Sequence, residues 1–260
     1  MKTIDFGFKA TIISILLALT TTLSAQVPAI EQSETLPFTG ERGEGPQEQK
    51  SAPVTATLGI DLVNQYIWRG QDLGNTSLQP TLGVEWKGLS LTAWGSVGIT
   101  RAEDTKELDF TLSYAYKGFT LGLTDYWFGE GSYFQYKSGK TTHIWEGFIG
   151  YDFGFLSATW YTNFAGDDGL NNSLERAYSS YFELKTPFRL AKLDWEGSVG
   201  LSPWATTTYG NTSFACTSVG LKATKDFLIK QKYHLPIFVG LNANPDSGKF
   251  YLLCGLRFSL

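Results

Sequence analysis

The last eleven residues, Phe250–Leu260 (FYLLCGLRFSL), alternate strictly between two kinds of side chain. One parity holds Phe250, Leu252, Cys254, Leu256 and Phe258, and the other holds Tyr251, Leu253, Gly255, Arg257 and Ser259. Because successive side chains of a β-strand point to opposite faces, this period of two predicts a strand with one apolar face. The chain ends inside the pattern, as expected of a barrel whose last strand closes the sheet against the first.

The same alternation recurs in runs separated by turn residues, and most runs have about the 9–11 residues that a tilted strand needs to cross a bilayer. The twelve predicted strands are Val54–Arg69, Leu78–Trp86, Leu89–Ile99, Glu107–Lys117, Phe119–Phe128, His143–Phe153, Phe155–Ala165, Tyr178–Phe188, Leu193–Trp204, Cys216–Phe227, Leu235–Asn244 and Phe250–Leu260. The sequence therefore predicts an all-β fold, a closed antiparallel transmembrane barrel of about twelve strands.

The connections between these strands alternate in length. Short joins such as Lys87-Gly88, Lys117-Gly118 and Phe153-Gly154 alternate with longer polar ones such as 70–77, 129–142 and 166–177. Short periplasmic turns and longer extracellular loops are typical of outer-membrane barrels. Parity alone does not tell inside from outside, so a secreted β-sandwich with an apolar core is the alternative.

Three domains are expected along the chain. Residues 1–25 read as a signal peptide, with Lys2 and Lys9 beside an apolar run and small residues before Gln26. Residues 26–53 are polar and rich in Glu, Gly and Pro, which predicts a disordered leader; a barrel plug or a periplasmic contact segment is the alternative. Residues 54–260 are expected to form the barrel, which lies in the outer membrane of a Gram-negative bacterium after the signal peptide has been removed.

Composition narrows the possible functions. The chain is 42% hydrophobic, 15% aromatic and 18% charged, with a net charge of −4, so no basic excess indicates nucleic acid as a partner. Its two cysteines, Cys216 and Cys254, are far apart, and neither has a second Cys or His at the spacing of a metal site. No Gly-rich phosphate loop is present either, so no cofactor or metal is expected.

Charged residues on the polar parity are the candidates for lining the barrel lumen. The acids are Asp61, Glu85, Glu107, Asp109, Glu146, Asp152, Glu183, Asp194, Glu196 and Asp226, and the bases are Arg69, Lys117, Lys185, Lys222 and Arg257. An excess of carboxylates in a wet pore favours cations. The alternative is a set of ion pairs that fill the interior, with Lys185 opposite Asp194 or Glu196, and Arg257 across the closing strands from Asp61.

Aromatic residues near the predicted strand ends suggest a girdle at the membrane interfaces, where Trp and Tyr are enriched. The candidates are Tyr66, Trp68, Trp86, Trp127, Trp145, Tyr151, Trp195 and Phe258. Arg69 follows Trp68 on the polar parity. We expect it to reach a luminal carboxylate and fix the loop, or else to face an anionic solute.

The sequence gives little sign of catalysis. His143 follows Ser138, Thr141 and Thr142 near the outer rim, on the lipid-facing parity, and no Asn or Asp obviously completes a catalytic set. No enzyme is predicted, and a barrel lipid hydrolase is the less favoured alternative. The loop 129–142, with Tyr133 and Tyr136, is expected either to constrict the lumen or to contact surface polysaccharide.

One motif carries a resemblance to a known family. The box Tyr66-Ile67-Trp68-Arg69-Gly70, followed by Gln79-Pro80 and by 88–96 (GLSLTAWGS), resembles small bacterial outer-membrane proteins described as porins of the TorF type. The match covers mainly the first third of the barrel. The family commonly has Ser after the Arg-Gly step, where Gln71 and Asp72 stand here. The resemblance implies an outer-membrane barrel with a pore, and it transfers no catalytic residue and no substrate.

The sequence therefore predicts a porin-like channel for passive diffusion of small polar solutes, with a preference for cations. The alternative is a closed structural or surface-recognition barrel. The expected partners are outer-membrane lipids, lipopolysaccharide, the barrel-assembly machinery and the solutes themselves.

Overall fold

A computed structural model describes residues 54–101, 103–230 and 233–259. The expected signal peptide (1–25) and leader (26–53) lie outside the described residues. The strands are β1 (Thr55–Val63), β2 (Tyr66–Trp68), β3 (Gln71–Gly74), β4 (Ser77–Trp86), β5 (Leu89–Gly98), β6 (Glu107–Tyr116), β7 (Phe119–Trp127), β8 (His143–Asp152), β9 (Ser157–Gly166), β10 (Ser180–Leu190), β11 (Leu193–Ser202), β12 (Ala215–Ile229), β13 (Tyr233–Asn244) and β14 (Lys249–Ser259).

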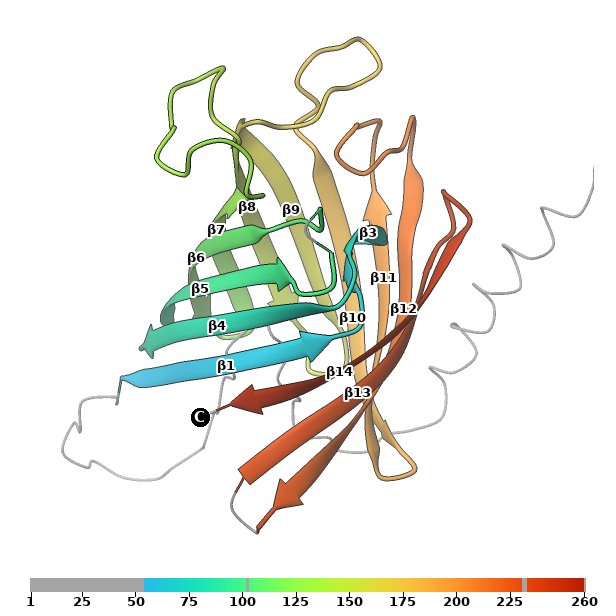
Figure 1. Ribbon diagram of the computed structural model, residues 1–260. Helices are drawn as coiled ribbons and strands as arrows, with labels where there is room; N and C mark the ends of the chain where they lie inside the picture. Colours follow the sequence, from blue (N-terminus) through green and yellow to red (C-terminus); the bar gives the residue numbers. More distant parts are fainter. Residues whose placement is uncertain (1–53, 102, 231–232, 260) are drawn as a thin grey trace, which may run out of the picture.

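Twelve of these strands form one closed barrel in which every neighbouring pair is antiparallel (Figure 1). Strands β4 to β14 follow one another around the wall in chain order, and β1 lies between β4 and β14. At the closing pair Asp61 is opposite Arg257, and Gly59 is opposite Ser259. The predicted fold class, a closed antiparallel barrel of twelve strands, is confirmed.

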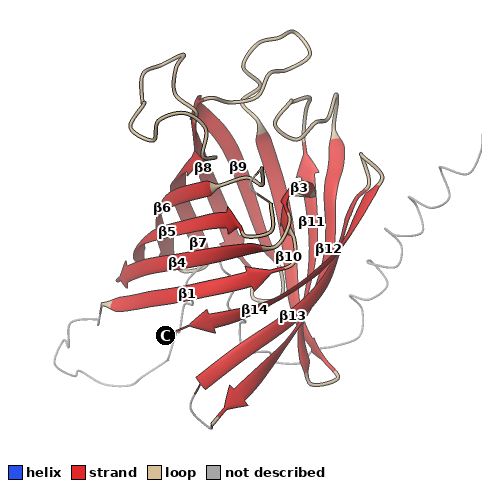
Figure 2. Cartoon of the chain, viewed as in Figure 1, coloured by secondary structure: helices blue, strands red, loops and turns tan. Residues whose placement is uncertain are grey.

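The connections differ in length at the two ends of the barrel. The turns that join β4 to β5, β6 to β7, β8 to β9 and β10 to β11 are short, whereas 128–142, 167–179 and 203–214 are long loops at the opposite end. Figure 2 shows the long loops gathered at one end of the barrel. We call the two ends the short-turn end and the long-loop end.

Pairs of residues with positive φ make the tight turns. Lys87 and Gly88 have φ of 50° and 84°, and Lys117 and Gly118 have φ of 49° and 86°. Positive φ at both central positions is the hairpin turn whose twist matches the flanking strands, and Gly adopts it without steric cost. The Lys-Gly pairs in the sequence therefore make two of the turns at the short-turn end.

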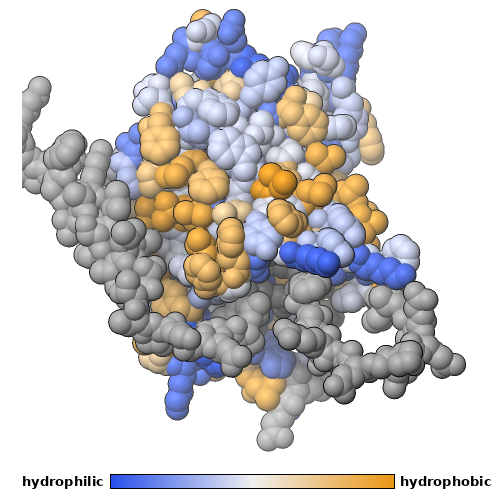
Figure 3. Space-filling view, turned by 180° about the vertical axis from the view of Figure 1, so that it is seen from behind, coloured by the Kyte–Doolittle hydropathy of each residue, from blue (hydrophilic) through white to orange (hydrophobic). Residues whose placement is uncertain are grey.

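The two faces of the wall have opposite chemistry. Apolar side chains such as Leu82 (57% exposed), Leu121 (56%) and Leu252 (63%) project from the outside, and apolar residues form a band across the visible face in Figure 3. The inner face buries polar side chains, among them Gln79 and Thr124. A soluble barrel has the reverse arrangement, so this wall is built to sit in lipid.

The described ranges contain no helix that is long and apolar enough to cross a membrane.

The predicted first strand, Val54–Arg69, is wrong in its second half. β1 ends at Val63, and Asn64 then binds the edge of β14: its Nδ2 donates to the Leu252 carbonyl at 2.9 Å, and its Oδ1 accepts from the Cys254 amide at 2.6 Å. The following chain leaves the wall and forms the separate two-stranded sheet of β2 and β3. We call residues 66–74 the interior hairpin.

Candidate functional site in the barrel interior

The interior hairpin turns at Arg69-Gly70, with φ of 50° and 83°. These values match those of the Lys87-Gly88 and Lys117-Gly118 turns at the short-turn end. Gly70 is required for a second reason: a Cβ at this position would collide with the backbone carbonyl of Thr217 on β12. The turn therefore lies directly against the inner wall.

Contacts of the hairpin run around the barrel. The Tyr66 ring lies 5.5 Å from that of Trp94 on β5, and the Gly70 carbonyl accepts a hydrogen bond of 3.0 Å from Asn244 Nδ2 on β13. The Trp68 ring lies 5.9 Å from that of Tyr126 on β7. Only a segment inside the lumen reaches strands so widely separated around the wall, and Figure 1 shows β3 within the barrel.

Arg69, at the tip of this hairpin, forms a two-pronged ion pair with Glu146 of β8. Its Nη1 and Nη2 atoms lie 2.6 Å and 2.8 Å from the Glu146 carboxylate oxygens Oε2 and Oε1. The side chains are only 8% and 0% exposed. Nη1 also donates to the Tyr209 hydroxyl at 2.6 Å, and the Tyr126 hydroxyl donates to Glu146 Oε1 at 2.9 Å. Paired hydrogen bonds between charged groups are among the strongest in proteins.

Four aromatic rings surround the Arg69 guanidinium, and we call them the aromatic cage. The distances from Cζ to the ring centres are 4.4 Å for Tyr161, 4.6 Å for Trp68, 4.7 Å for Tyr181 and 5.8 Å for Tyr209. A cation within about 6 Å of an aromatic face is attracted by the ring quadrupole. Burial raises the pKa of the Tyr209 hydroxyl above its ordinary value, so this loop residue stays neutral.

The expectation that Arg69 reaches a luminal carboxylate is confirmed, and the partner is Glu146. Tyr66 and Trp68, by contrast, are not girdle residues: both belong to the interior hairpin and pack on luminal aromatic rings. The physical reason is the exit of the chain from the wall after Val63. It puts both side chains inside the barrel, where strand continuation would have put them outside.

The remaining girdle candidates lie on wall strands. Trp86 (49% exposed), Trp145 (40%) and Phe258 (53%) are exposed, and Trp127, Tyr151 and Trp195 are partly exposed. A membrane-interface role for these six stays a prediction.

Other charged candidates form ion pairs on the inner face. Arg257 donates from Nε and Nη2 to the two carboxylate oxygens of Asp61, both at 2.7 Å, so the predicted pair across the closing strands is confirmed. The expected position of Lys185 is wrong: the residue opposite it on β11 is Ser198, and neither Asp194 nor Glu196. Lys185 pairs at 2.8 Å with Glu183 on its own strand.

The two acids expected near Lys185 have other partners. Asp194 lies opposite Arg189 and pairs with it at 3.4 Å, and Glu196 lies opposite Lys222 on β12 and pairs with it at 3.8 Å. Glu107 and Asp109 on β6 are buried. Glu85 is half-buried, and Asp152 is exposed at the short-turn end.

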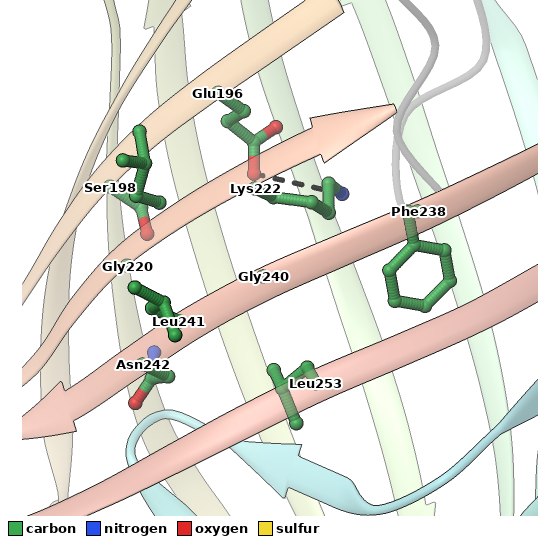
Figure 4. A pocket seen from close by; sticks show the side chains of 10 residues that line it. Glu196, Ser198, Gly220, Lys222, Phe238, Gly240, Leu241, Asn242 and Leu253 are labelled. Carbon is green, nitrogen blue, oxygen red and sulfur yellow. Dashed lines mark ion pairs between the residues drawn. The ribbon is translucent and has the colours of Figure 1, made fainter. Parts of the chain in front are cut away.

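A small cavity of about 130 Å³ lies along the inner wall of β11–β14 (Figure 4). The Glu196–Lys222 pair, Ser198, Asn242 and Phe238 line it. Gly220 and Gly240 contribute no side chain to this part of the wall. The inner wall therefore has a recess of mixed polar and apolar lining on these four strands, a third of the barrel.

His143 offers no catalytic geometry. It lies on the outer face of β8 but is only 1% exposed, because the rings of Tyr133 and Tyr136 cover it at 5.1 Å and 4.4 Å. Its Nδ1 is 2.7 Å from Asp125 Oδ1, and its Nε2 is 2.6 Å from the Tyr133 carbonyl oxygen. Nε2, the nitrogen that would have to face a nucleophile, is directed at the Tyr133 carbonyl oxygen.

These contacts also place the loop 129–142. Tyr133 and Tyr136 pack on outward-facing residues of β7 and β8, including Trp127 and Trp145. The expectation that this loop constricts the lumen is therefore wrong for Tyr133 and Tyr136, which lie on the outer face of the barrel.

No family model matches the sequence, and no curated protein matches it. Solved structures with a similar barrel include a chain from work described as "Unveiling the Mechanism Behind the in-meso Crystallization of Membrane Proteins", with 9% identity, a TM-score of 0.45, and coverage of 79% of this chain and 83% of that one. Another is Salmonella typhi OmpF in complex with daunomycin, with 9% identity, a TM-score of 0.35, and coverage of 80% and 97%.

Proposed function

We propose that the protein is a porin-like channel of a Gram-negative outer membrane, through which small polar solutes diffuse passively with a preference for cations. The observation that carries this proposal is the reversed chemistry of the wall. Apolar side chains cover the outside of a closed barrel, while charged and hydroxyl side chains line the inside. Such a wall holds a polar path across lipid.

The interior hairpin makes this a narrow, gated channel. It crosses the lumen between β5, β8 and β13, so a solute passes either when the hairpin shifts or beside it, along the recess on β11–β14. The box Tyr66–Gly70, which carries the resemblance to the TorF-type porins, comprises β2 and the turn of this hairpin.

Selectivity tests this function directly. Acids outnumber bases among the luminal candidates, ten to five. We expect the purified protein in a planar bilayer to show current steps whose reversal potential, in a KCl gradient, has the sign of cation preference. Heat-unfolded protein is the control. A reversal potential of the opposite sign contradicts the proposed preference for cations. The absence of current both in wild type and in variants with a released hairpin contradicts the channel.

The packing of the hairpin favours one alternative function. A barrel kept shut by the Arg69–Glu146 pair is a closed scaffold that presents its long loops to a partner. The two functions differ in variants with a released hairpin, since only the channel then conducts.

A further inference from the structure

We propose that the inner wall carries a binding site for a small guanidinium or alkylammonium cation, and that Arg69 of the interior hairpin occupies this site in the structure. The inference deepens the proposed channel function by naming a solute class. It starts from the chemistry that surrounds the guanidinium.

Most of the site belongs to the wall and its loops. We call this set the wall site: Tyr126 of β7, Glu146 of β8, Tyr161 of β9, Tyr181 of β10 and Tyr209 of the loop 203–214. Of the groups around the guanidinium, only Trp68 comes from the hairpin. Withdrawal of the hairpin therefore removes the cation and leaves the carboxylate with the faces of three tyrosines.

The wall site is built around one buried carboxylate. Glu146 is 0% exposed and accepts a hydrogen bond from the Tyr126 hydroxyl. A buried charge requires a partner of opposite sign, and a carboxylate accepts a planar guanidinium through two parallel hydrogen bonds. The flat faces of Tyr161 and Tyr181, at 4.4 Å and 4.7 Å from Cζ, complete the recognition of a cation.

The interior hairpin is a small element, so it does not hold Arg69 in the wall site permanently. β2 has three residues and β3 has four, and their pairing contains a register shift between Tyr66 and Ile67. A free cation of the same shape therefore competes with Arg69, and its binding is linked to release of the hairpin.

The test uses the full-length protein with Arg69→Ala and methylguanidinium as the probe. Calorimetric titration of the folded variant in detergent should show methylguanidinium binding at least tenfold tighter than in wild type. Methylguanidinium should also bind Arg69→Ala at least tenfold more tightly than it binds the double variant Arg69→Ala/Glu146→Gln. N-methylurea, the neutral analogue, should not bind Arg69→Ala. The matched control is Arg257→Ala, which bares Asp61 without an aromatic cage and should bind at least tenfold more weakly.

Equal binding by Arg69→Ala and Arg69→Ala/Glu146→Gln, or no binding by folded Arg69→Ala, overturns the proposal. If Arg69→Ala does not fold, wild type decides: methylguanidinium should raise single-channel open probability severalfold, and an effect no larger than that of N-methylurea overturns it. Calorimetry measures binding whether or not the protein conducts, so the two proposals can fail separately. Binding of methylguanidinium without conductance contradicts only the proposed channel, and conductance without binding contradicts only the proposed cation site.

Discussion

Replacing Glu146 with Gln will release the interior hairpin and open the lumen. The substitution keeps the size of the side chain but leaves the buried Arg69 without its charge partner. Removing one member of a buried ion pair costs about 3–5 kcal/mol. Because 1.4 kcal/mol is a factor of ten, the closed state should be disfavoured by about a hundredfold or more. Single-channel recording should show a correspondingly higher open probability.

The control for this variant is Glu183→Gln, which breaks the Lys185–Glu183 pair on β10 and leaves the Arg69–Glu146 pair in place. Its open probability should stay near that of wild type. Adding Arg69→Ala to Glu146→Gln should produce little further change, because the two residues act as one unit. Equal open probabilities in wild type and in folded Glu146→Gln protein would show that the pair does not hold the hairpin.

The second large effect is expected where the barrel closes. β1 and β14 pair over five positions, compared with nine between β1 and β4, and Arg257 binds both carboxylate oxygens of Asp61 across this joint. Asp61→Asn removes the charge of the acceptor, and the loss of charge-assisted hydrogen bonds should destabilise the barrel by about 2–3 kcal/mol. The midpoint of heat-modifiable mobility on gels measures it.

Asp226→Asn is the matched control, because Asp226 pairs with His234 near the short-turn end and both side chains are largely exposed. Exposed ion pairs contribute about 0–1 kcal/mol, so its midpoint should move little. Similar midpoints for Asp61→Asn and wild type would mean that the pair contributes nothing to closure.

The strands were predictable because the wall separates lipid from a polar interior, and that separation fixes a period of two in the sequence. Predicted Glu107–Lys117 corresponds to β6 at Glu107–Tyr116, and predicted His143–Phe153 to β8 at His143–Asp152. The turns are local as well, because two adjacent residues with positive φ are enough to make them.

The interior hairpin was missed although the sequence contains a signal for it. Arg69-Gly70 has the same basic residue–glycine form as Lys87-Gly88 and Lys117-Gly118, which were recognised as turns. The polar pair Asn64-Gln65 also interrupts the alternation just before it. Reading these two features together predicts that the strand ends at Val63 and a hairpin follows.

The composition of the site could be predicted only in part. Arg69 and Glu146 were identified separately from their parity, but they are 77 positions apart, and nothing local in the sequence pairs them. The tyrosines of the cage were not identified at all. Tyr161 does share the parity of Thr159 and Asn163, which is the parity of the inner face, and such aromatics on the polar side are the available signal.

The central claim is that a polar lumen runs through the barrel and that residues 66–74 close it. The most direct test is single-channel conductance of a full-length variant in which 65–75 is replaced by a short Gly/Ser linker, with folding checked by heat-modifiable mobility. We predict a steady, cation-selective conductance several times that of wild type. A folded variant that conducts no more than wild type would contradict the account.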